Sequence, residues 1–191
     1  AGEGQVTITR PGHRPLTTAL GLKGSYQLAN LTTALAALDQ LKVALADSQL
    51  AGALATVRLP GRFQLLGEQP PVIIDGAHNP DGARHLLAAL KAAYPQAKFF
   101  FVLGFLADKN VAAMVDLYRP VASRSWLVTP DHPTRRLPAQ KLRDLLPEGE
   151  VAPSVAAGLK AARAAADPQT VVVVTGSFYV IREVAKKWSN S

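Results

Sequence analysis

From Arg62 onward, short apolar runs alternate with segments whose apolar residues recur at helical spacing. Runs of strand length cover Val72–Asp75, Phe99–Leu103, Ser125–Thr129 and Thr170–Thr175, and a shorter extended piece near Phe63–Leu66 predicts an edge strand. Helices are predicted near Pro80–Tyr94, Val111–Tyr118, Pro138–Leu146 and Pro153–Ala166, and after Ser177. Continuous apolar strands that alternate with helices indicate an α/β fold, with a mainly parallel sheet covered by helices on both faces.

The first 60 residues have a different pattern. Residues Gln5 to Arg10 alternate polar and apolar before a Pro- and Gly-containing turn, which predicts a β-hairpin. Leucines recur at helical spacing from Gln27 to Leu45, and Asp47 can cap a second helix that runs to about Val57. This part holds too few strands to close a substantial core. We therefore expect two domains, residues 1–60 as the end of a domain whose beginning is absent and residues 61–191 as a full α/β domain.

Composition narrows the possible functions. Apolar residues make up 48% of the chain, enough for a substantial core, and no apolar run is long enough to span a bilayer. The absence of cysteine excludes disulfides and thiolate metal sites and agrees with a cytoplasmic protein. The net charge is +7, but the basic residues are scattered and aromatic residues make up only 6%, which argues against nucleic acid as a partner. Small anionic molecules fit this charge equally well, and a monomer is the starting expectation.

The turn Asp75-Gly76-Ala77-His78-Asn79-Pro80 follows a buried strand, where open α/β sheets bind ligands. The Asp75 carboxylate can accept two hydroxyl hydrogen bonds, as ribose recognition needs, and His78 can donate to an anion or shuttle a proton. A structural interpretation also exists, in which Asp75 caps the turn and Asn79 caps the helix that Pro80 opens. The local sequence leaves both interpretations open.

A second polar turn, Thr175-Gly176-Ser177-Phe178, follows a strand of four valines. Its backbone N–H groups and the Ser177 hydroxyl suit a carboxylate or phosphate, although Ser177 can equally be a helix N-cap. Lys109 follows another strand and can meet an anion, but an Asp-Lys pair such as Asp108-Lys109 is usually solvated. The chain has no glycine-rich phosphate loop ending in Lys-Ser or Lys-Thr, and no cluster of metal ligands at the usual spacing.

Taken together, several short motifs resemble the folylpolyglutamate synthase/dihydrofolate synthase family of the Mur-ligase superfamily. They are, in chain order, Gly24–Asn30, Leu59–Arg62, Asp75–Pro80, Gly104 with Ala107–Lys109, and Thr175–Phe178. Their order and spacing carry the resemblance more than any single motif does. The family commonly has histidine where this chain has Tyr26, so the resemblance assigns no role to that position. The turn that begins at Asp75 favours the folate branch over other Mur ligases.

The resemblance implies an ATP-dependent amide ligase. In such enzymes ATP phosphorylates a carboxylate of dihydropteroate or a folate, and the amine of glutamate attacks the acyl phosphate. Residues that match Asn30, Arg62 and Asp75 contact the adenine, phosphate and ribose of ATP, respectively. Residues that match His78 and Ser177 lie toward glutamate, and His78 is the one candidate here for a catalytic role. The family also uses Mg²⁺, whose ligands, like the phosphate loop, are expected in the missing amino-terminal part.

The resemblance further implies that residues 61–191 form a Rossmann-like carboxy-terminal domain, and that residues 1–60 are the remnant of a central ATP-binding domain. We therefore expect a carboxy-terminal fragment that does not catalyse alone. Two other functions stay open, a non-catalytic nucleotide- or anion-binding α/β module and another Mur-type amino-acid ligase. At single positions, Asn30 as an ordinary helix residue and Arg62 as an interdomain salt bridge are the structural alternatives.

Overall fold

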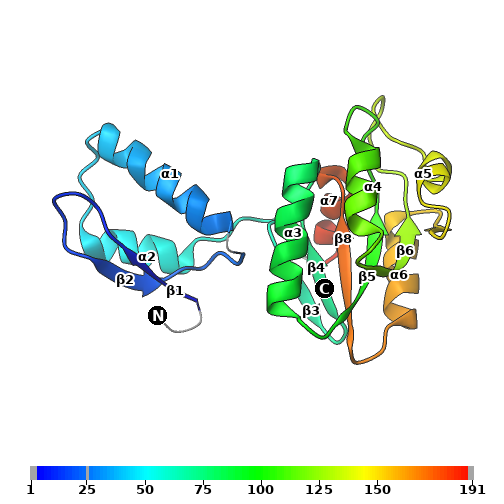
Figure 1. Ribbon diagram of the computed structural model, residues 1–191, viewed down its shortest axis with the longest axis horizontal. Coiled ribbons are helices and arrows are strands. Elements are labelled where there is room, and N and C mark those ends of the chain that lie inside the picture. Colours follow the sequence, from blue (N-terminus) through cyan, green and yellow to red (C-terminus); the bar gives the residue numbers. More distant parts are fainter. Residues whose placement is uncertain (1–3, 25, 189–191) are drawn as a thin grey trace. The chain divides into compact units, whose positions relative to one another are not determined.

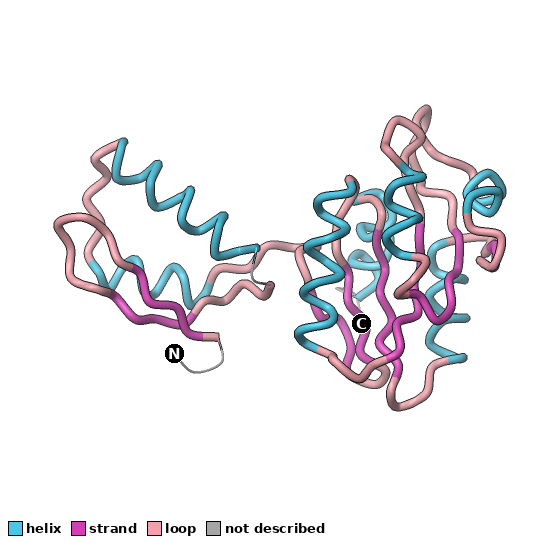
Figure 2. The backbone as a smooth tube through the Cα atoms, viewed as in Figure 1, coloured by secondary structure: helices cyan, strands magenta, loops and turns pink. Residues whose placement is uncertain are grey.

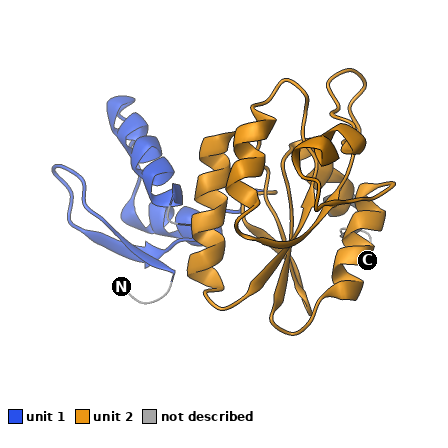
Figure 3. Cartoon of the chain, turned by 45° about the vertical axis from the view of Figure 1, so that its right-hand side comes forward, with its two compact units in different colours: residues 1–60 blue, residues 61–191 orange. Residues whose placement is uncertain are grey.

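The computed structural model describes residues 4–24 and 26–188. The chain divides into two compact units, residues 1–60 and residues 61–191 (Figure 3). Each unit has a hydrophobic core of its own.

The first unit is a β-hairpin packed with two helices (Figure 1). Strands β1 (Gln5–Ile8) and β2 (Leu16–Ala19) pair antiparallel, and α1 (Tyr26–Gln40) and α2 (Asp47–Thr56) follow. The buried core is limited to Ile8, Leu35, Leu50 and Leu54. A core of this size gives limited hydrophobic stabilisation.

Helix α1 ends at Gln40, whereas the leucine spacing predicted that it would run to Leu45. Lys42 takes a left-handed conformation with φ of 53°, and the Val43 N–H donates to the Leu38 carbonyl at 3.1 Å. This is a helix-ending turn of the kind that usually contains glycine at the left-handed position. Because a lysine stands there instead, the usual sequence signal for the helix end is missing.

The second unit has a six-stranded sheet in the order β3-β4-β8-β5-β6-β7. Figure 2 shows its strands in magenta among the helices in cyan. Its strands are β3 (Gln64–Glu68), β4 (Pro71–Ile74), β5 (Lys98–Leu103), β6 (Ala122–Leu127), β7 (Glu150–Val151) and β8 (Thr170–Thr175). All neighbouring pairs are parallel except β3 with β4, so β3 is the antiparallel edge strand. The prediction of an α/β fold with a mainly parallel sheet is confirmed.

Helices cover both faces of this sheet. They are α3 (Pro80–Ala93), α4 (Val111–Tyr118), α5 (Ala139–Leu145), α6 (Val155–Ala165) and α7 (Phe178–Trp188). Residues of α3, α4 and α5 share one core with sheet residues such as Ile73 and Phe101, and residues of α6 and α7 share the other with neighbours such as Ile74 and Val102. The alternation of neighbouring strand residues between two cores explains why these strands are apolar without interruption.

Two elements near the β7 edge differ from the sequence prediction. β6 occupies Ala122–Leu127 rather than 125–129, because the Thr129 hydroxyl accepts the Ala139 N–H at the start of α5, at 2.9 Å, and the residue belongs to that turn. The strand instead begins with partly exposed residues, among them Arg124, that carry no apolar signal. β7 has two residues, both exposed, and was not predicted.

The connections change face at the carboxyl ends of the central strands. β8 lies between β4 and β5, but β4 and β5 lead into helices on one face whereas β8 leads into α7 on the other. Where neighbouring strands send their connections to opposite faces, the turns diverge and leave space for a ligand. The backbone N–H of Asp75 donates to Val174 O at 3.1 Å and that of Gly104 to Thr175 O at 3.3 Å, so the three turns are held together.

Candidate functional site

Asp75 closes the turn that follows β4. Its Oδ1 accepts the Ala77 N–H and its Oδ2 accepts the Phe63 N–H, both at 2.8 Å, and the residue is only 4% exposed. Burial raises the pKa of the Asp75 carboxyl above its ordinary value, while the two N–H groups and the positive charge of Arg62 act in the opposite direction. This is the turn-cap geometry of the structural interpretation. A ligand would have to use the lone pairs that the two backbone N–H groups leave over.

The end of the same turn begins α3. The Asn79 side chain accepts the Gly82 N–H at 2.7 Å and Pro80 is the first residue of the helix, as the capping interpretation requires. His78 lies between these caps, and its Nδ1 is 2.9 Å from the Gly76 carbonyl. Because a carbonyl only accepts, Nδ1 donates this hydrogen bond, and Nε2 is not used in it.

Arg62 is held against the β4 turn by hydrogen bonds of its two neighbours. The Gly61 carbonyl accepts the Gly76 N–H at 2.8 Å, and the Phe63 N–H reaches Asp75 as described. Gly61 and Phe63 both have positive φ, 68° and 44°, and Phe63 is buried in the core. A bulky residue in that conformation is strained and persists only where packing enforces it. The backbone therefore fixes where the Arg62 side chain starts.

The guanidinium of Arg62 lies over the ring of Phe178, with Cζ 4.8 Å from the ring centroid. Among the side chains described in the second unit, those of residues 61–184, this guanidinium makes neither a hydrogen bond nor an ion pair. Its N–H donors are therefore not used by the described side chains of the second unit. An arginine that is stacked but unpaired is well suited to bind the oxygens of a phosphate or carboxylate.

Ser177 starts α7. Its Oγ accepts the Tyr179 N–H at 3.1 Å, and the residue is 2% exposed. This is the N-cap interpretation of Ser177. Thr175, at the end of β8, is fully buried, and its hydroxyl has no hydrogen-bond partner among the described residues. The turn after β8 thus places two hydroxyls and its backbone next to the turns of β4 and β5.

Lys109 lies in the loop after β5. Asp108 pairs with Lys109 at 3.4 Å and with Arg135 at 3.3 Å, which ties this loop to the one after β6. The pair is partly exposed on the surface, as the solvated interpretation predicted.

Asn30 belongs to the first unit. It is exposed on α1, and its Nδ2 donates to the Gln27 side chain one turn earlier, at 3.0 Å. The Gln27 side chain is buried, so the amide of Asn30 is oriented by a fixed partner. The four other predicted site residues, Arg62, Asp75, His78 and Ser177, all lie at or beside the turns after β4 and β8 in the second unit.

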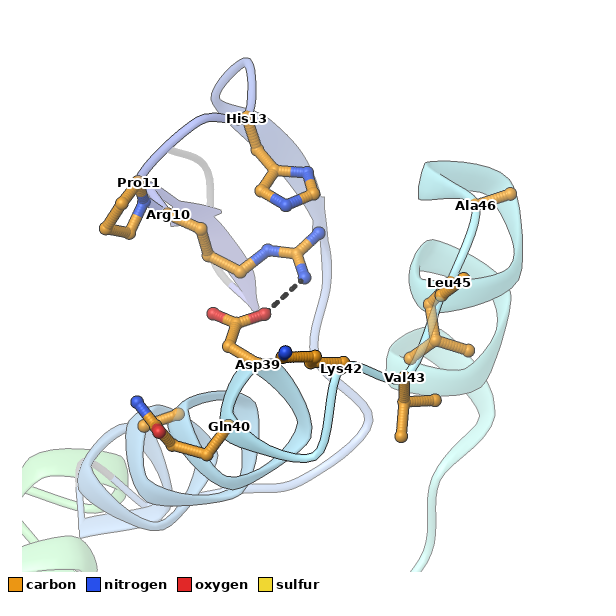
Figure 4. Close-up of a pocket in the computed structure, with 11 residues that line it drawn as sticks. Arg10, Pro11, His13, Asp39, Gln40, Lys42, Val43, Leu45 and Ala46 are labelled. Atoms are coloured by element: carbon orange, nitrogen blue, oxygen red, sulfur yellow. Dashed lines mark hydrogen bonds and ion pairs between the residues drawn. The ribbon is translucent and has the colours of Figure 1, made fainter.

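The first unit also has a pocket of about 920 Å³ that the sequence did not predict (Figure 4). It lies between the hairpin turn and the end of α1. The Arg10 guanidinium in its wall is almost fully buried and pairs with Asp39 at 3.3 Å and with Asp47 at 3.8 Å. The carboxylates of this unit thus compensate the buried charge, which indicates a structural role for Arg10.

Metal coordination and membrane insertion find no support in the described residues. This part of the chain contains no group of three or more His, Cys, Asp or Glu side chains placed to hold a metal ion. None of the helices described is both long and apolar enough to cross a membrane.

Phe178 belongs to this site, although no role was predicted for it from the sequence. A Cβ atom on Gly76 would lie 2.5 Å from the Phe178 ring, so the ring packs directly against the turn, and the His78 ring lies 6.1 Å away between centroids. The motif Thr175–Phe178 pointed to this turn. The contacts of Phe178 with Arg62 and Gly76 form only in the folded chain, so no local sequence pattern predicts them.

The strand order and the polar turns define an α/β domain whose polar turns meet at the topological switch point of the sheet. The model of the family "Mur ligase, glutamate ligase domain" matches residues 61–178. The chain therefore belongs to this family, and the resemblance seen in the motifs is confirmed. The dihydrofolate synthase/folylpolyglutamate synthase of Escherichia coli (strain K12) is 35% identical over 155 residues, which are 81% of this chain and 36% of that protein.

Solved structures of the same branch have the same fold. The E. coli FolC in complex with DHPP and ADP matches 99% of this chain and 47% of its own, with a TM-score of 0.83 and 29% identity. A bifunctional folylpolyglutamate synthase/dihydrofolate synthase with Mn, AMPPNP and L-glutamate bound matches 98% of this chain and 47% of its own, with a TM-score of 0.84 and 31% identity. The chain thus spans less than half the length of these relatives.

Proposed function

We propose that this chain is the carboxy-terminal part of an ATP-dependent ligase that adds glutamate to dihydropteroate, to a folate, or to both. In this reaction a carboxylate oxygen of the acceptor attacks the γ-phosphorus of ATP, which releases ADP and forms an acyl phosphate. The amine of glutamate then attacks the acyl carbon, the amide bond forms, and phosphate leaves. Residues 1–60 would be the end of the central ATP-binding domain, and residues 61–191 the Rossmann-like carboxy-terminal domain.

One observation carries this proposal: Arg62, inside the matched family region, is stacked on Phe178 and has no hydrogen-bond or ion-pair partner among the described side chains of the second unit. The names of the similar structures support it, since those proteins were solved with ADP, or with AMPPNP, Mn and L-glutamate. A planar cation with free N–H groups can bind two phosphate oxygens at once. The chemistry of phosphoryl transfer needs such charge compensation.

The other site residues receive roles consistent with their geometry. Asn30 would contact adenine with its amide, Arg62 a phosphate, and Asp75 the ribose through its remaining lone pairs. His78 and Ser177 would lie toward glutamate. In these roles Asp75 and Ser177 would act while also serving as caps, so a ligand and the turn would share them.

The metal and the cellular setting complete the proposal. ATP would act with Mg²⁺, which would neutralise phosphate charge during transfer, and the metal ligands and the phosphate loop would come from outside these 191 residues. The described residues of this chain offer Arg62 as the cation for the phosphates. The protein would be a cytoplasmic monomer, and the chain alone would not catalyse.

An isotope experiment on the whole protein tests the proposed chemistry. The acceptor carboxylate is labelled with ¹⁸O, and the released phosphate is analysed by mass spectrometry after turnover with ATP and L-glutamate. One labelled oxygen should appear in phosphate, because the acyl phosphate keeps the acceptor oxygen. Unlabelled phosphate accompanied by amide formation would exclude this mechanism.

Two alternatives differ in what they predict for the whole protein. A non-catalytic nucleotide- or anion-binding module, which the turn-cap roles of Asp75 and Ser177 would suit, binds nucleotide without any product. Another Mur-type ligase would join a different amino acid to a different acceptor. Incubation with single amino acids and with dihydropteroate or tetrahydrofolate separates the three cases.

A further inference from the structure

The Phe178 ring contacts Arg62 and Gly76, which both lie more than a hundred residues earlier in the sequence. It stands at the first position of α7, carries the Arg62 guanidinium over its face at 4.8 Å, and packs on Gly76 so closely that no Cβ would fit there. Phe178 itself is 38% exposed although it is a large apolar side chain. Its contacts are thus concentrated on the site rather than in the core.

Stacking on an aromatic face restricts a guanidinium without using its hydrogen-bond donors. The attraction is electrostatic, between the cation and the π face of the ring, and leaves the N–H groups at the edge of the plane free. A salt bridge would fix the arginine as well, but it would consume those donors. The pairing with Phe178 is therefore suited to a residue that must be both ordered and available.

We propose that Phe178 is a positioning residue that holds the guanidinium of Arg62 in the orientation required to bind the phosphates of ATP. The inference rests on the proposed function, in which Arg62 is the phosphate ligand. Phe178 would not contact the reacting atoms. With Phe178 in place, the Arg62 side chain would already be restricted before nucleotide binds and would lose less conformational entropy on binding. Removal of the Phe178 ring would therefore weaken ATP binding rather than slow the chemical step.

This role requires an aromatic ring at position 178. Phe178→Leu keeps an apolar side chain but removes the π face, whereas Phe178→Tyr and Phe178→Trp keep a face. In the whole ligase, Phe178→Leu should raise the Michaelis constant for ATP roughly three- to tenfold with little change in kcat, a range set by typical cation–π strengths. The Tyr and Trp variants should restore it. The Michaelis constant for glutamate should stay within about twofold, because Arg62 is not its ligand.

A second measurement, on the 191-residue chain, does not depend on activity. The Nε–H resonance of Arg62 in NMR spectra should be displaced by the ring current of Phe178, and this displacement should vanish in Phe178→Leu. Tyr179→Leu is the matched control, because Tyr179 is the next residue and carries a different arginine, Arg182, at 4.4 Å. That variant should move the Arg182 signal and leave the Arg62 signal in place.

The two measurements separate the possible failures. An unchanged Arg62 resonance in Phe178→Leu overturns the inference, as does an active ligase whose ATP constant is the same in Phe178→Leu as in the wild type. Equal loss in the Leu, Tyr and Trp variants also overturns it, since this would show a packing role without a need for a π face. If the resonance behaves as expected but the whole protein shows no ATP-dependent ligation, the proposed function fails while the stacking of Arg62 on Phe178 is upheld.

Discussion

The two carboxylate oxygens of Asp75 each accept a backbone N–H, from Phe63 and from Ala77. In Asp75→Asn one acceptor oxygen becomes an NH₂ group, so one of these buried N–H groups loses its partner. We expect the free energy of unfolding to fall by about 1–3 kcal/mol. Urea denaturation measures this, and Asp81→Asn on the exposed first turn of α3 is the control, with an expected change of within about 0.5 kcal/mol. Equal stability of Asp75→Asn and wild type would mean that these hydrogen bonds contribute little.

Asp75 also makes stability depend on pH. Burial raises the pKa of its carboxyl above the ordinary value of 3.8. For a raised carboxyl, the folded state favours the protonated form, so this contribution to stability is complete below that value and is lost as pH rises through the folded pKa. The stability of the wild type minus that of Asp75→Asn should therefore fall as pH increases over this window. A difference that rises with pH would show that the N–H groups and Arg62 outweigh burial.

Arg62 can be tested against Arg124, which is also stacked on an aromatic ring but is ion-paired with Glu150. Arg124 lies over Trp126 at 4.8 Å, the same distance as Arg62 over Phe178, but on β6 at the far side of the sheet. In the whole ligase, Arg62→Ala should lower kcat/KM for ATP about 10- to 100-fold, as expected for a lost charged hydrogen bond of about 1.5–3 kcal/mol. Arg62→Lys should restore activity only partly, because lysine lacks the planar fork. Similar losses in Arg62→Ala and Arg124→Ala would contradict a specific role for Arg62.

The turn after β4 packs against α7 at Gly76. No positive φ requires this glycine, so the packing of Phe178 alone explains it. Gly76→Ala should push the ring aside and destabilise the protein by about 1–3 kcal/mol. Gly52→Ala in α2 is the matched control, because nothing lies within 4 Å of its Cβ position, and it should stabilise the helix by about 0.5–1 kcal/mol. Thermal unfolding measures both, and equal effects would remove the packing argument.

The elements that the sequence predicted well are those whose burial leaves a local pattern. Thr170–Thr175 is buried at every position, and its run of valines predicted the bounds of β8 correctly. The end of α1 at Gln40 and the two-residue β7 were missed, because a left-handed lysine and an exposed edge pair leave no such pattern. The predicted end of β6 at Thr129 was wrong, because the Thr129 side chain accepts a hydrogen bond at the start of α5.

The candidate site was predictable as turns but not as an arrangement. The motifs placed Asp75, His78 and Ser177 after strands and Arg62 at the domain junction before the sheet, and the fold then brought these positions together. The sequence left open whether Asp75 and Ser177 cap backbone N–H groups or bind a ligand. The structure shows both as caps, which does not exclude ligand binding. The stacking of Arg62 on Phe178 joins positions more than a hundred residues apart, and no local spacing encodes it.

At the scale of the whole molecule, the chain matches less than half of each relative, such as 36% of the E. coli synthase and 47% of its FolC structure. The described residues supply an arginine and polar turns but no group of acidic or histidine side chains that could hold a metal ion. We therefore expect the 191-residue chain alone to give no ligation product, since phosphoryl transfer needs positioned phosphates and metal. Product formed by the purified chain, free of host ligase, would show that this division of the site is wrong.

We propose that this chain is part of a ligase that joins glutamate to a folate-type acceptor and converts ATP to ADP and phosphate. The most direct test incubates the whole protein with ATP, Mg²⁺, L-glutamate and either dihydropteroate or tetrahydrofolate, and follows the acceptor by mass spectrometry together with ADP. We expect the mass of the acceptor to increase by one glutamyl residue, and one ADP to be released for each amide formed. Both products should be sharply reduced in Arg62→Ala. Unmodified acceptor with either substrate, from a folded protein that binds ATP, would contradict this proposal.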